Sequence, residues 1–345
     1  MEKVRVAVDA MGGDYAPYAP VEGCLSALRK SCCLEIALLG NEPLIRTVLE
    51  SSSYDRKSLK VIGCSEAIET SEPPAAAIRT KKDSSIVRGM KLLKDGDADA
   101  FVSAGNTGAL LVGGQVIVGR LKGVERAPLG AFLPTEKGMC LLIDCGANVD
   151  ARPSWLLQFA EIGSAYAENI LKIKKPRVAL VNIGAEEEKG SSLVRKTYSL
   201  LKDFSSVHFT GFVESGDISS GCADVIVTDA FTGNIILKEY EGVSKTIFRM
   251  LGKKIESCSG VGSSSSFYKN AIRQVSEVFD VSSYGGAPLL GLKGLVIKAH
   301  GNSSAQEICN SIIQCCSFHK DEVNLRICRR LAEEEEALRK LHPDL

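Results

Sequence analysis

Short apolar runs recur along the chain, and each ends in a cluster of glycine, asparagine or aspartate. The first reads VRVAVDAMGGD at residues 4–14. Similar runs occupy residues 98–114, 140–150, 177–190, 223–242 and 294–312. Nearly continuous apolar runs of this length, bounded by turn residues, are typical of strands buried on both faces. Helical patterns follow several of them, so the chain alternates between strand, loop and helix.

This alternation predicts an α/β fold. Strands that alternate with helices indicate a mostly parallel sheet covered on both faces, that is, a three-layer α/β/α arrangement. The length of 345 residues suits one large body or two domains that share one sheet. We expect a single α/β body over residues 1–345. Ligands of such sheets bind outside the carboxyl ends of the strands, which is where the small polar clusters stand, so one site assembled from several loops is expected.

Residues 238–282 break the alternation and predict a helical hairpin that projects from the body. Apolar and basic residues each repeat every four positions on opposite sides of the first helix, as in an amphipathic helix. The apolar row is Val243, Ile247, Leu251 and Ile255, and the basic row is Lys245, Arg249 and Lys253. The polar stretch SCSGVGSSSS follows, and then a second amphipathic pattern. Residues 321–341 predict a charged C-terminal helix.

Composition narrows the possible functions. Acidic and basic residues balance at 42 each, so no overall field attracts nucleic acid. The twelve cysteines contain no C-x-x-C pair, which indicates reduced thiols of a cytosolic protein. Asp9 interrupts the first apolar run and no basic segment precedes it, so a signal peptide is not expected and the location is predicted to be cytoplasmic.

Familiar catalytic motifs are missing from the sequence. It contains no G-x-S-x-G, Walker A, H-E-x-x-H or G-x-G-x-x-G motif. Four histidines in all argue against a metal site built from several histidines. Neither a metal nor an organic cofactor is therefore expected.

Two strand-loop-helix segments are the best candidates for binding an anion. In Ala104–Leu111 (AGNTGALL), glycines let the backbone approach a ligand, and Asn106 and Thr107 stand where a helix begins. Free amides and the helix dipole favour phosphate at such a position. Residues 229–238 have the same form, with donors at Thr232, Gly233 and Asn234 behind Asp229. For both segments, simple helix capping is an equally good explanation.

Single residues in other loops leave two explanations open. Lys189 follows three glutamates and could neutralise a phosphate or an oxyanion, or form a surface ion pair. His300 could donate a proton or bind an anion, or serve as a cap. Cys145 has no identifiable base, so a buried structural thiol is favoured over a nucleophile. The basic row of the hairpin is either a solvated face or a docking surface for an acidic partner helix.

Read in order, the loops resemble those of one family, the bacterial acyl-[acyl carrier protein]:phosphate acyltransferases of phospholipid synthesis. The matching motifs are VAVDAMGGDYAP, SAGNTGALL, DCGANVD, NIGAEEEKG, TDAFTGNIILK, YGGAPLLG and the final HG, between about residues 3 and 305. The resemblance implies transfer of a fatty acyl group from the carrier protein's thioester to inorganic phosphate, giving acyl phosphate. It also implies a fold similar to isocitrate and isopropylmalate dehydrogenases and phosphate acetyltransferases, and a homodimer without metal or nucleotide.

The residues suit this chemistry. Hydrogen phosphate is already a nucleophile at pH 7, and a thiolate with a pKa of about 8.5 leaves without a strong general acid. An anion cradle, an oxyanion hole and alignment are then sufficient. We expect Lys189 to neutralise phosphate or the oxyanion, His300 to assist proton transfer, and Asp229 to orient donors. Expected substrate ligands are Asp9, Gly12, Gly13, Ser103, Asn106, Thr107, Asn148, Asn182, Thr232, Gly233 and Asn234.

Partners follow from the resemblance as well. Lys245, Arg249 and Lys253 are expected to meet the acidic recognition helix of the carrier protein by charge complementarity. Family members often contact membrane through apolar residues at the hairpin tip, whereas the tip here is poor in large apolar groups, so any peripheral contact is expected to be weak. Three rival functions are a short-chain transacylase that uses coenzyme A, a decarboxylating dehydrogenase, and a non-catalytic scaffold that binds carrier protein.

Overall fold

The computed structural model describes the chain except residues 1–2, 51, 258–263, 280–283 and 342–345. Its strands fall into two sheets. The first sheet has the order β10-β11-β4-β1-β2-β3, and its neighbours pair in parallel except for β10 and β11. Its strands are β1 (Val4–Asp9), β2 (Leu34–Gly40), β3 (Leu59–Gly63), β4 (Ala100–Ser103), β10 (Ala287–Leu289) and β11 (Leu295–Lys298).

The second sheet has the order β5-β6-β9-β7-β8 and is parallel except for the β5-β6 pair. Its strands are β5 (Gly130–Thr135), β6 (Gly138–Ile143), β7 (Arg177–Val181), β8 (His208–Val213) and β9 (Val225–Val227). The sheets meet edge to edge, because an antiparallel bridge joins Leu129, just before β5, to Leu289 of β10. The mostly parallel α/β fold predicted from the alternating pattern is confirmed.

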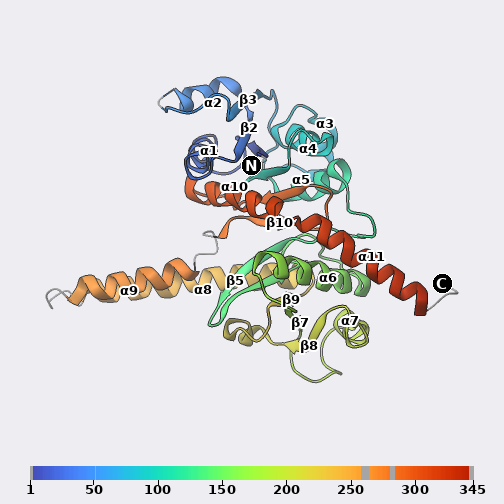
Figure 1. Cartoon of the computed structure of the whole chain (residues 1–345). Helices are drawn as coiled ribbons and strands as arrows, with labels where there is room; N and C mark the ends of the chain where they lie inside the picture. The colour runs from blue at the N-terminus through green and yellow to red at the C-terminus, as the bar shows by residue number, and fades with distance from the viewer. Residues whose placement is uncertain (1–2, 51, 258–263, 280–283, 342–345) are drawn as a thin grey trace.

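Helices cover both faces of the first sheet (Figure 1). Alternate residues of a strand point to opposite faces. Val6 and Val8 pack in one buried cluster with α1 and α10, whereas Ala7 belongs to the cluster of α4 and α5. These helices are α1 (Tyr18–Lys30), α10 (Ala305–Lys320), α4 (Ser85–Asp95) and α5 (Thr107–Gly113), which continues into the π-helix η1 (Gly114–Val118). Two shorter ones are α2 (Glu42–Leu49) and α3 (Pro74–Thr80).

The second sheet is also covered on both faces. Helix α6 (Pro153–Ile170) shares a buried cluster with Leu141 and Val225, while Leu142 and Ile226 pack on the opposite side with the start of α8. Helices α7 (Ser192–Lys202) and α11 (Val323–Leu341) lie beside α6, and η2 (Ser215–Ser220) is a 3-10 helix. The cluster around α6 also contains Val6 and Val8, so one apolar core runs through both sheets.

The division into two sheets differs from the single sheet expected. A short apolar run predicts a buried strand but carries no information about which strands lie beside it. Here β5 and β6 form an antiparallel pair that starts the second sheet. Treating residues 1–345 as one body stays a prediction.

The predicted helical hairpin consists of α8 (Ala230–Ser257) and α9 (Ser264–Phe279), which pack side by side and project from the body (Figure 1). Helix α8 begins before the predicted start at residue 238, because it continues directly from the loop after β9. Most of the polar stretch at the tip, residues 258–263, lies outside the described residues, so membrane contact there stays a prediction. None of the described helices is both long and apolar enough to span a bilayer.

Candidate functional site

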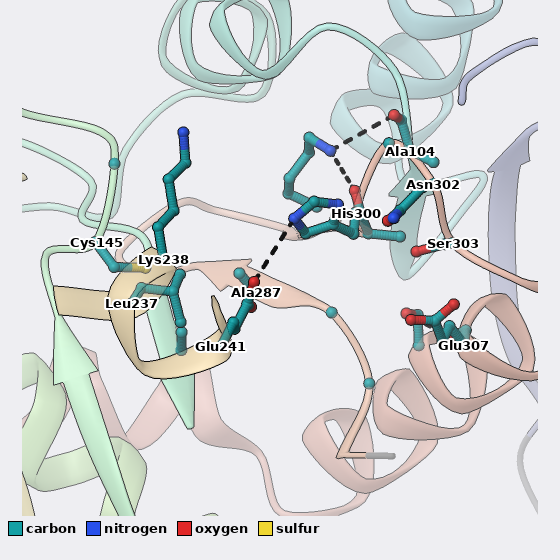
Figure 2. Close-up of a pocket in the computed structure, with 18 of the residues that line it drawn as sticks. Ala104, Cys145, Leu237, Lys238, Glu241, Ala287, His300, Asn302, Ser303 and Glu307 are labelled. Atoms are coloured by element: carbon teal, nitrogen blue, oxygen red, sulfur yellow. Dashed lines mark hydrogen bonds and ion pairs between the residues drawn. The ribbon is translucent and has the colours of Figure 1, made fainter. Parts of the chain in front are cut away.

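A large pocket lies between the carboxyl ends of the first sheet's central strands and helix α8. Its volume is about 910 Å³, which is within the range of small-molecule sites. Loops after β1, β4 and β11 supply one wall, and α8 supplies the other (Figure 2). Phosphate-sized and chain-like ligands both fit a pocket of this size, so its lining decides which chemistry it supports.

Glycines in the loop wall allow the backbones of the three loops to pack closely against one another. A Cβ on Gly12 would lie 2.5 Å from both the Asp9 carboxylate and the Gly105 amide nitrogen. Gly13 has a φ of +96°, and a Cβ there would lie 2.8 Å from the carbonyl oxygen of Gly301. Only glycine suits such a combination of close approach and left-handed backbone. The loops after β1, β4 and β11 are therefore held in one fixed arrangement.

Lys298 is the partly buried cation of this wall. It ends β11, lines the pocket, and its Nζ donates to the carbonyl oxygens of Ala299 and Ala104. Burial lowers the pKa of Lys298 to about 8, and the negative charges of Asp9 and Asp14 oppose that shift. A cation with little water around it and carbonyl partners only is well placed to bind an anion that enters the pocket.

Asp9 lies behind this wall and is 2 % exposed. It accepts hydrogen bonds from the Ser103 hydroxyl at 2.7 Å and from the Met11 amide at 2.9 Å. Burial raises the pKa of Asp9, against the effect of these hydrogen bonds. Asp9 and Ser103 thus fix the ends of β1 and β4 and do not line the pocket.

Two ionisable side chains face each other across the pocket. His300 Nε2 lies 4.0 Å from Oε2 of Glu241, which is on α8 (Figure 2). The His300 side chain is 60% exposed, and the loop residues Asn302 and Ser303 continue the same wall. The pair joins the loop wall to the helix wall at the middle of the pocket.

The end of β6 closes the α8 side of the pocket. Cys145 and Gly146 line it, and Asn234 Nδ2 donates to the carbonyl oxygen of Cys145 at 3.2 Å. Burial raises the pKa of the Cys145 thiol well above its ordinary value. Cys145 is therefore not an activated thiolate, which agrees with the interpretation of a structural thiol.

The structure brings together only part of the set of expected site residues. Those that line the pocket are Gly13, Thr107, Asn234, Lys245 and His300. Gly12, Ser103 and Asn106 lie directly behind them in the loops after β1 and β4. The remaining expected ligands hold neighbouring loops together.

The loop at the start of α8 uses its polar groups internally. Asp229 accepts hydrogen bonds from the amide and the hydroxyl of Thr232, at 3.0 and 2.8 Å. A Cβ on Gly233 would lie 1.9 Å from the carbonyl oxygen of Asp144. Asn148 donates to Ala127 and to Asp144. These residues position the first turn of α8 and do not line the pocket.

Lys189 and Asn182 belong to the loop after β7. Lys189 Nζ lies 2.8 Å from Glu186 and its side chain is half exposed. Asn182 is buried and donates to the carbonyl oxygens of Gly184 and Lys189. Because β7 is the parallel neighbour of β9, this loop leaves the same edge of the sheet as the loop that leads into α8. Neither residue lines the pocket, and the substrate roles expected for them stay predictions.

Asn106 is a helix cap in this structure. Its Oδ1 accepts from the Ala109 amide at 2.9 Å, and its Nδ2 donates to the carbonyl oxygens of Glu69, Thr70 and Glu72. This amide therefore ties the segment before α3 to the start of α5. Thr107, the next residue, is exposed and lines the pocket.

Replacing Asn106 with alanine is expected to destabilise the fold by roughly 2–3 kcal/mol. The change removes both the helix cap and the hydrogen bonds that the buried side-chain amide donates to the segment before α3. Thermal unfolding followed by circular dichroism measures the change. Asn41→Ala, which removes the cap of the exposed helix α2, is the matched control and should cost only about 1 kcal/mol. Equal losses in the two variants would contradict the tying role of Asn106.

Sequence reasoning missed two residues that the structure makes central. Lys298 was hidden inside the apolar run LVIKAH, although a lone charge at the carboxyl end of a buried strand is a usable sign. Asp144 follows β6 and is fully buried. Its carboxylate accepts hydrogen bonds from the backbone amides of Leu129, Gly146, Ala147 and Asn148, and from the side-chain amide of Asn148. It thus organises the loop that carries Cys145.

Comparison with known proteins decides the family. The family model described as "Fatty acid synthesis protein" matches residues 4–326. A phosphate acyltransferase from Clostridium perfringens is 44% identical over 320 residues, which cover 93% of this chain and 94% of that protein. One from Alkaliphilus oremlandii is 45% identical over 320 residues, or 93% and 95% of the two chains. The chain belongs to this family.

The resemblance of the loop motifs to phosphate acyltransferases is thereby confirmed, and the chain is an acyltransferase. Solved structures share the fold of this phosphate acyltransferase family member. A phosphotransacetylase from Streptococcus pyogenes has a TM-score of 0.58 and 19% identity over 92% of this chain and 94% of its own. The EutD phosphotransacetylase from Staphylococcus aureus has a TM-score of 0.56 and 17% identity, with 93% and 94% coverage.

The region shared with the phosphate acyltransferase family contains the whole pocket, since its lining residues lie between Gly13 and Ser311. Across the part of the chain that the structure describes, no group of three or more histidine, cysteine, aspartate or glutamate side chains is arranged to hold a metal ion. The polar side chains of the pocket include Lys238, Lys245, Lys298 and His300, hydroxyls and amides, together with the carboxylates of Asp14, Glu241 and Glu307. The lysines, the histidine and the backbone amides are groups that bind and orient an oxyanion.

Proposed function

We propose that this phosphate acyltransferase transfers a fatty acyl group from acyl-[acyl carrier protein] to inorganic phosphate, giving acyl phosphate for phospholipid synthesis. One observation supports this most: a single pocket joins a polar end, with the partly buried Lys298 and the exposed His300, to an apolar wall that includes Leu237 and Phe248. The polar end suits phosphate, and the apolar wall suits an alkyl chain.

The reaction needs positioning more than covalent help from the enzyme. Phosphate bound at Lys298 would attack the thioester carbonyl, so that a C–O bond forms and the C–S bond breaks. The carrier's thiolate leaves and takes up a proton. Lys298 would offset the charge of the attacking phosphate, while His300, opposite Glu241, holds or moves a proton at the centre of the pocket. Cys145, whose pKa is raised by burial, is left without a covalent role.

Lys189 retains a place in this proposal. Its ammonium group is exposed and forms an ion pair with the equally exposed Glu186, and such surface pairs are weak. An incoming phosphate competes easily with a partner of this kind. We therefore keep Lys189 as a second cation that reaches the substrate from the loop after β7.

Carrier-protein docking is proposed for the basic row of α8. Lys245 lines the pocket, and Arg249 and Lys253 continue the row away from it along exposed positions of the same helix. A row of cations that starts at the pocket would guide an acidic helix so that its thioester arm enters.

Reversing all three charges (Lys245→Glu, Arg249→Glu and Lys253→Glu) is expected to raise KM for acyl carrier protein by about tenfold or more, because attraction becomes repulsion. Steady-state rates at several salt concentrations measure this, and salt should lower the parent's kcat/KM more than the variant's. A control with the same charge change on exposed Lys91, Lys94 and Lys122 should keep the parent's KM. An equal rise in both variants would remove the docking role.

A homodimer is proposed as the working form. The opposite side of α8 exposes Val243, Ile247 and Leu251, each more than two-fifths exposed, in a continuous apolar row. Rows of this kind are usually covered by a partner, and a second copy of the chain would cover it. Sedimentation equilibrium should give a dimer for the parent and a monomer for Ile247→Glu; a monomeric parent would contradict the proposal.

The deciding experiment is synthesis of acyl phosphate by the purified protein from palmitoyl-[acyl carrier protein] and phosphate, with Lys189→Ala measured beside it. Turnover supports the proposal, and its loss in a folded Lys189→Ala places that lysine at the substrate. Turnover with acetyl-coenzyme A but none with acyl carrier protein would establish the short-chain alternative. Carrier-protein binding with no turnover of either donor would favour the scaffold.

A further inference from the structure

The pocket is long in one direction, along α8. The residues of α8 that line it extend from Asn234 to Phe248. At 1.5 Å of rise per residue this stretch is about 21 Å long. A polar ligand such as phosphate fills only a small part of such a length, so most of the pocket must serve another portion of the substrate.

The end of the pocket near the root of the hairpin is aromatic. Phe248 of α8 and Phe279 of α9 have ring centroids 5.8 Å apart, and Tyr240 stacks on Phe279 at 6.2 Å. Phe248 and Phe279 both line the pocket and are only half buried. Aromatic faces left open inside a pocket gain free energy when an apolar ligand covers them.

A small residue leaves a path between the polar centre and Phe248. Ser244 lies one turn before Phe248 on the same side of α8 and three residues beyond Glu241. Ser244 Oγ donates to the carbonyl oxygen of Tyr240 at 2.7 Å, so its polarity is satisfied within the helix. The path is therefore wide enough, and neutral enough, for a methylene chain.

We infer that Phe248 forms the far wall, and Phe279 a side wall, of an acyl-chain subsite. This inference rests on the proposed function, with the thioester carbonyl at the level of His300 and Glu241. Phe279 contacts both Tyr240, next to Glu241, and Phe248, so it lies between these two levels. From Glu241 to Phe248 the helix rises about 10 Å. An extended chain advances about 1.2 Å per bond, so the Phe248 ring meets the acyl chain at about its ninth carbon. Phe248 thus distinguishes long from short acyl chains.

The volume agrees with this assignment. A methylene group occupies about as much space as a water molecule, roughly 30 Å³, so a sixteen-carbon chain takes up roughly 500 Å³. The pocket of about 910 Å³ holds this chain together with phosphate and the end of the carrier's thioester arm.

The test compares a long and a short donor in one variant. In Phe248→Ala, kcat/KM for palmitoyl-[acyl carrier protein] should fall about tenfold or more, while that for the octanoyl donor changes less than about twofold, because only the long chain reaches this ring. Phe231→Ala is the matched control, since Phe231 is on α8 but is 61% exposed and outside the pocket. It should leave both values unchanged.

A second variant covers the case in which the alanine variant does not fold. Phe248→Glu places a carboxylate at the half-buried far wall, where only the long chain reaches, and should reduce the long-to-short ratio by about tenfold with no cavity created. An unchanged ratio in a folded, active variant of either design overturns the inference and leaves the proposed function standing.

A binding measurement, which needs no turnover, tests the acyl-chain subsite independently of the proposed function. Calorimetry with octyl and hexadecyl phosphate, which resemble the product, should show tighter binding of the longer compound by the parent and loss of that preference in Phe248→Glu. If no donor is turned over while this preference is present, the proposed function fails and the subsite remains. If the parent binds both compounds equally, the subsite is disproved.

Discussion

Replacing Lys298 with methionine is expected to lower kcat/KM for phosphate at least about 100-fold in acyl phosphate synthesis. Loss of a contact to a buried charge removes roughly 3 kcal/mol of binding, and each 1.4 kcal/mol is a factor of ten. The reason is specific to this lysine, because it is partly buried and held by two carbonyl oxygens, whereas Lys238 and Lys245, which also line the pocket, are exposed. Steady-state rates at varied phosphate concentration measure the effect.

Lys293→Met is the matched control, since Lys293 is exposed and lies just before the same strand, outside the pocket. It should retain the parent's kcat/KM. A folded Lys298→Met with nearly the parent's value would remove Lys298 from phosphate binding and leave Lys189 as the leading cation.

The pH dependence of the same lysine has a definite sign. Only protonated Lys298 attracts phosphate, and its pKa is lowered by burial to about 8. KM for phosphate should therefore rise as the pH passes about 8 in the parent and stay nearly constant in Lys298→Met. A parent KM that is constant from pH 7 to 9.5 would contradict this assignment.

Stability should change in the opposite direction to activity. The folded lysine loses its proton near pH 8, whereas the ordinary pKa of 10.5 applies to the unfolded chain, which keeps its proton longer. Below pH 8 the folded state therefore carries the full cost of a buried charge, and its stability increases between pH 8 and 10.5. Lys298→Met should unfold at a higher temperature than the parent at pH 7, and this advantage should shrink as the pH rises to 10.5.

Asp144→Ala is expected to be the most destabilising single change in the site. The Asp144 carboxylate is completely buried and accepts hydrogen bonds from four backbone amides and one side-chain amide. Each buried donor left without a partner costs about 1–3 kcal/mol, and partial access of water leaves a net loss of roughly 4 kcal/mol. For a chain of 345 residues this corresponds to a decrease in Tm of about 5 °C.

The matched control is Asp150→Ala, an exposed aspartate of the same loop, which should change stability by less than about 0.5 kcal/mol. Asp144→Asn should have an intermediate Tm. Its side-chain oxygen still accepts hydrogen bonds from the donors on one side of the carboxylate, while its NH₂ group faces the donors on the other side. Differential scanning calorimetry ranks the three variants. A Tm of Asp144→Ala equal to that of the parent would show that the loop after β6 is held by other contacts.

The fold was largely readable from the sequence because strands buried on both faces are continuous apolar runs. Each run singled out from the pattern became a strand, including β1, β4 and β11. The pattern does not show which strands pair. Nothing in the run at residues 140–150 shows that its strand, β6, pairs antiparallel with β5 and belongs to a second sheet. Such pairing depends on contacts between distant parts of the chain.

The site was readable only in part, for a related reason. Loops after strands could be found, but the choice between a ligand contact and an internal cap depends on which way a side chain turns. Asn106 and Asp229 turn inward to hold their own loops, while Thr107 and Asn234 face the pocket. Lys298 escaped notice because it stood inside an apolar run, and its burial emerged only from the folded chain.

The long helix α8 has a mechanical consequence. Its 28 residues form a rod of about 42 Å, whose first turn is wedged against the carbonyl of Asp144 and whose far end lies beyond the body (Figure 1). A lever of this length that tilts by about 5° around its wedged end moves the free end by about 4 Å and displaces Asn234 very little. Under the proposed docking on α8, an acyl carrier protein would move with the free end while residues at the root of the helix, such as Asn234, keep their positions.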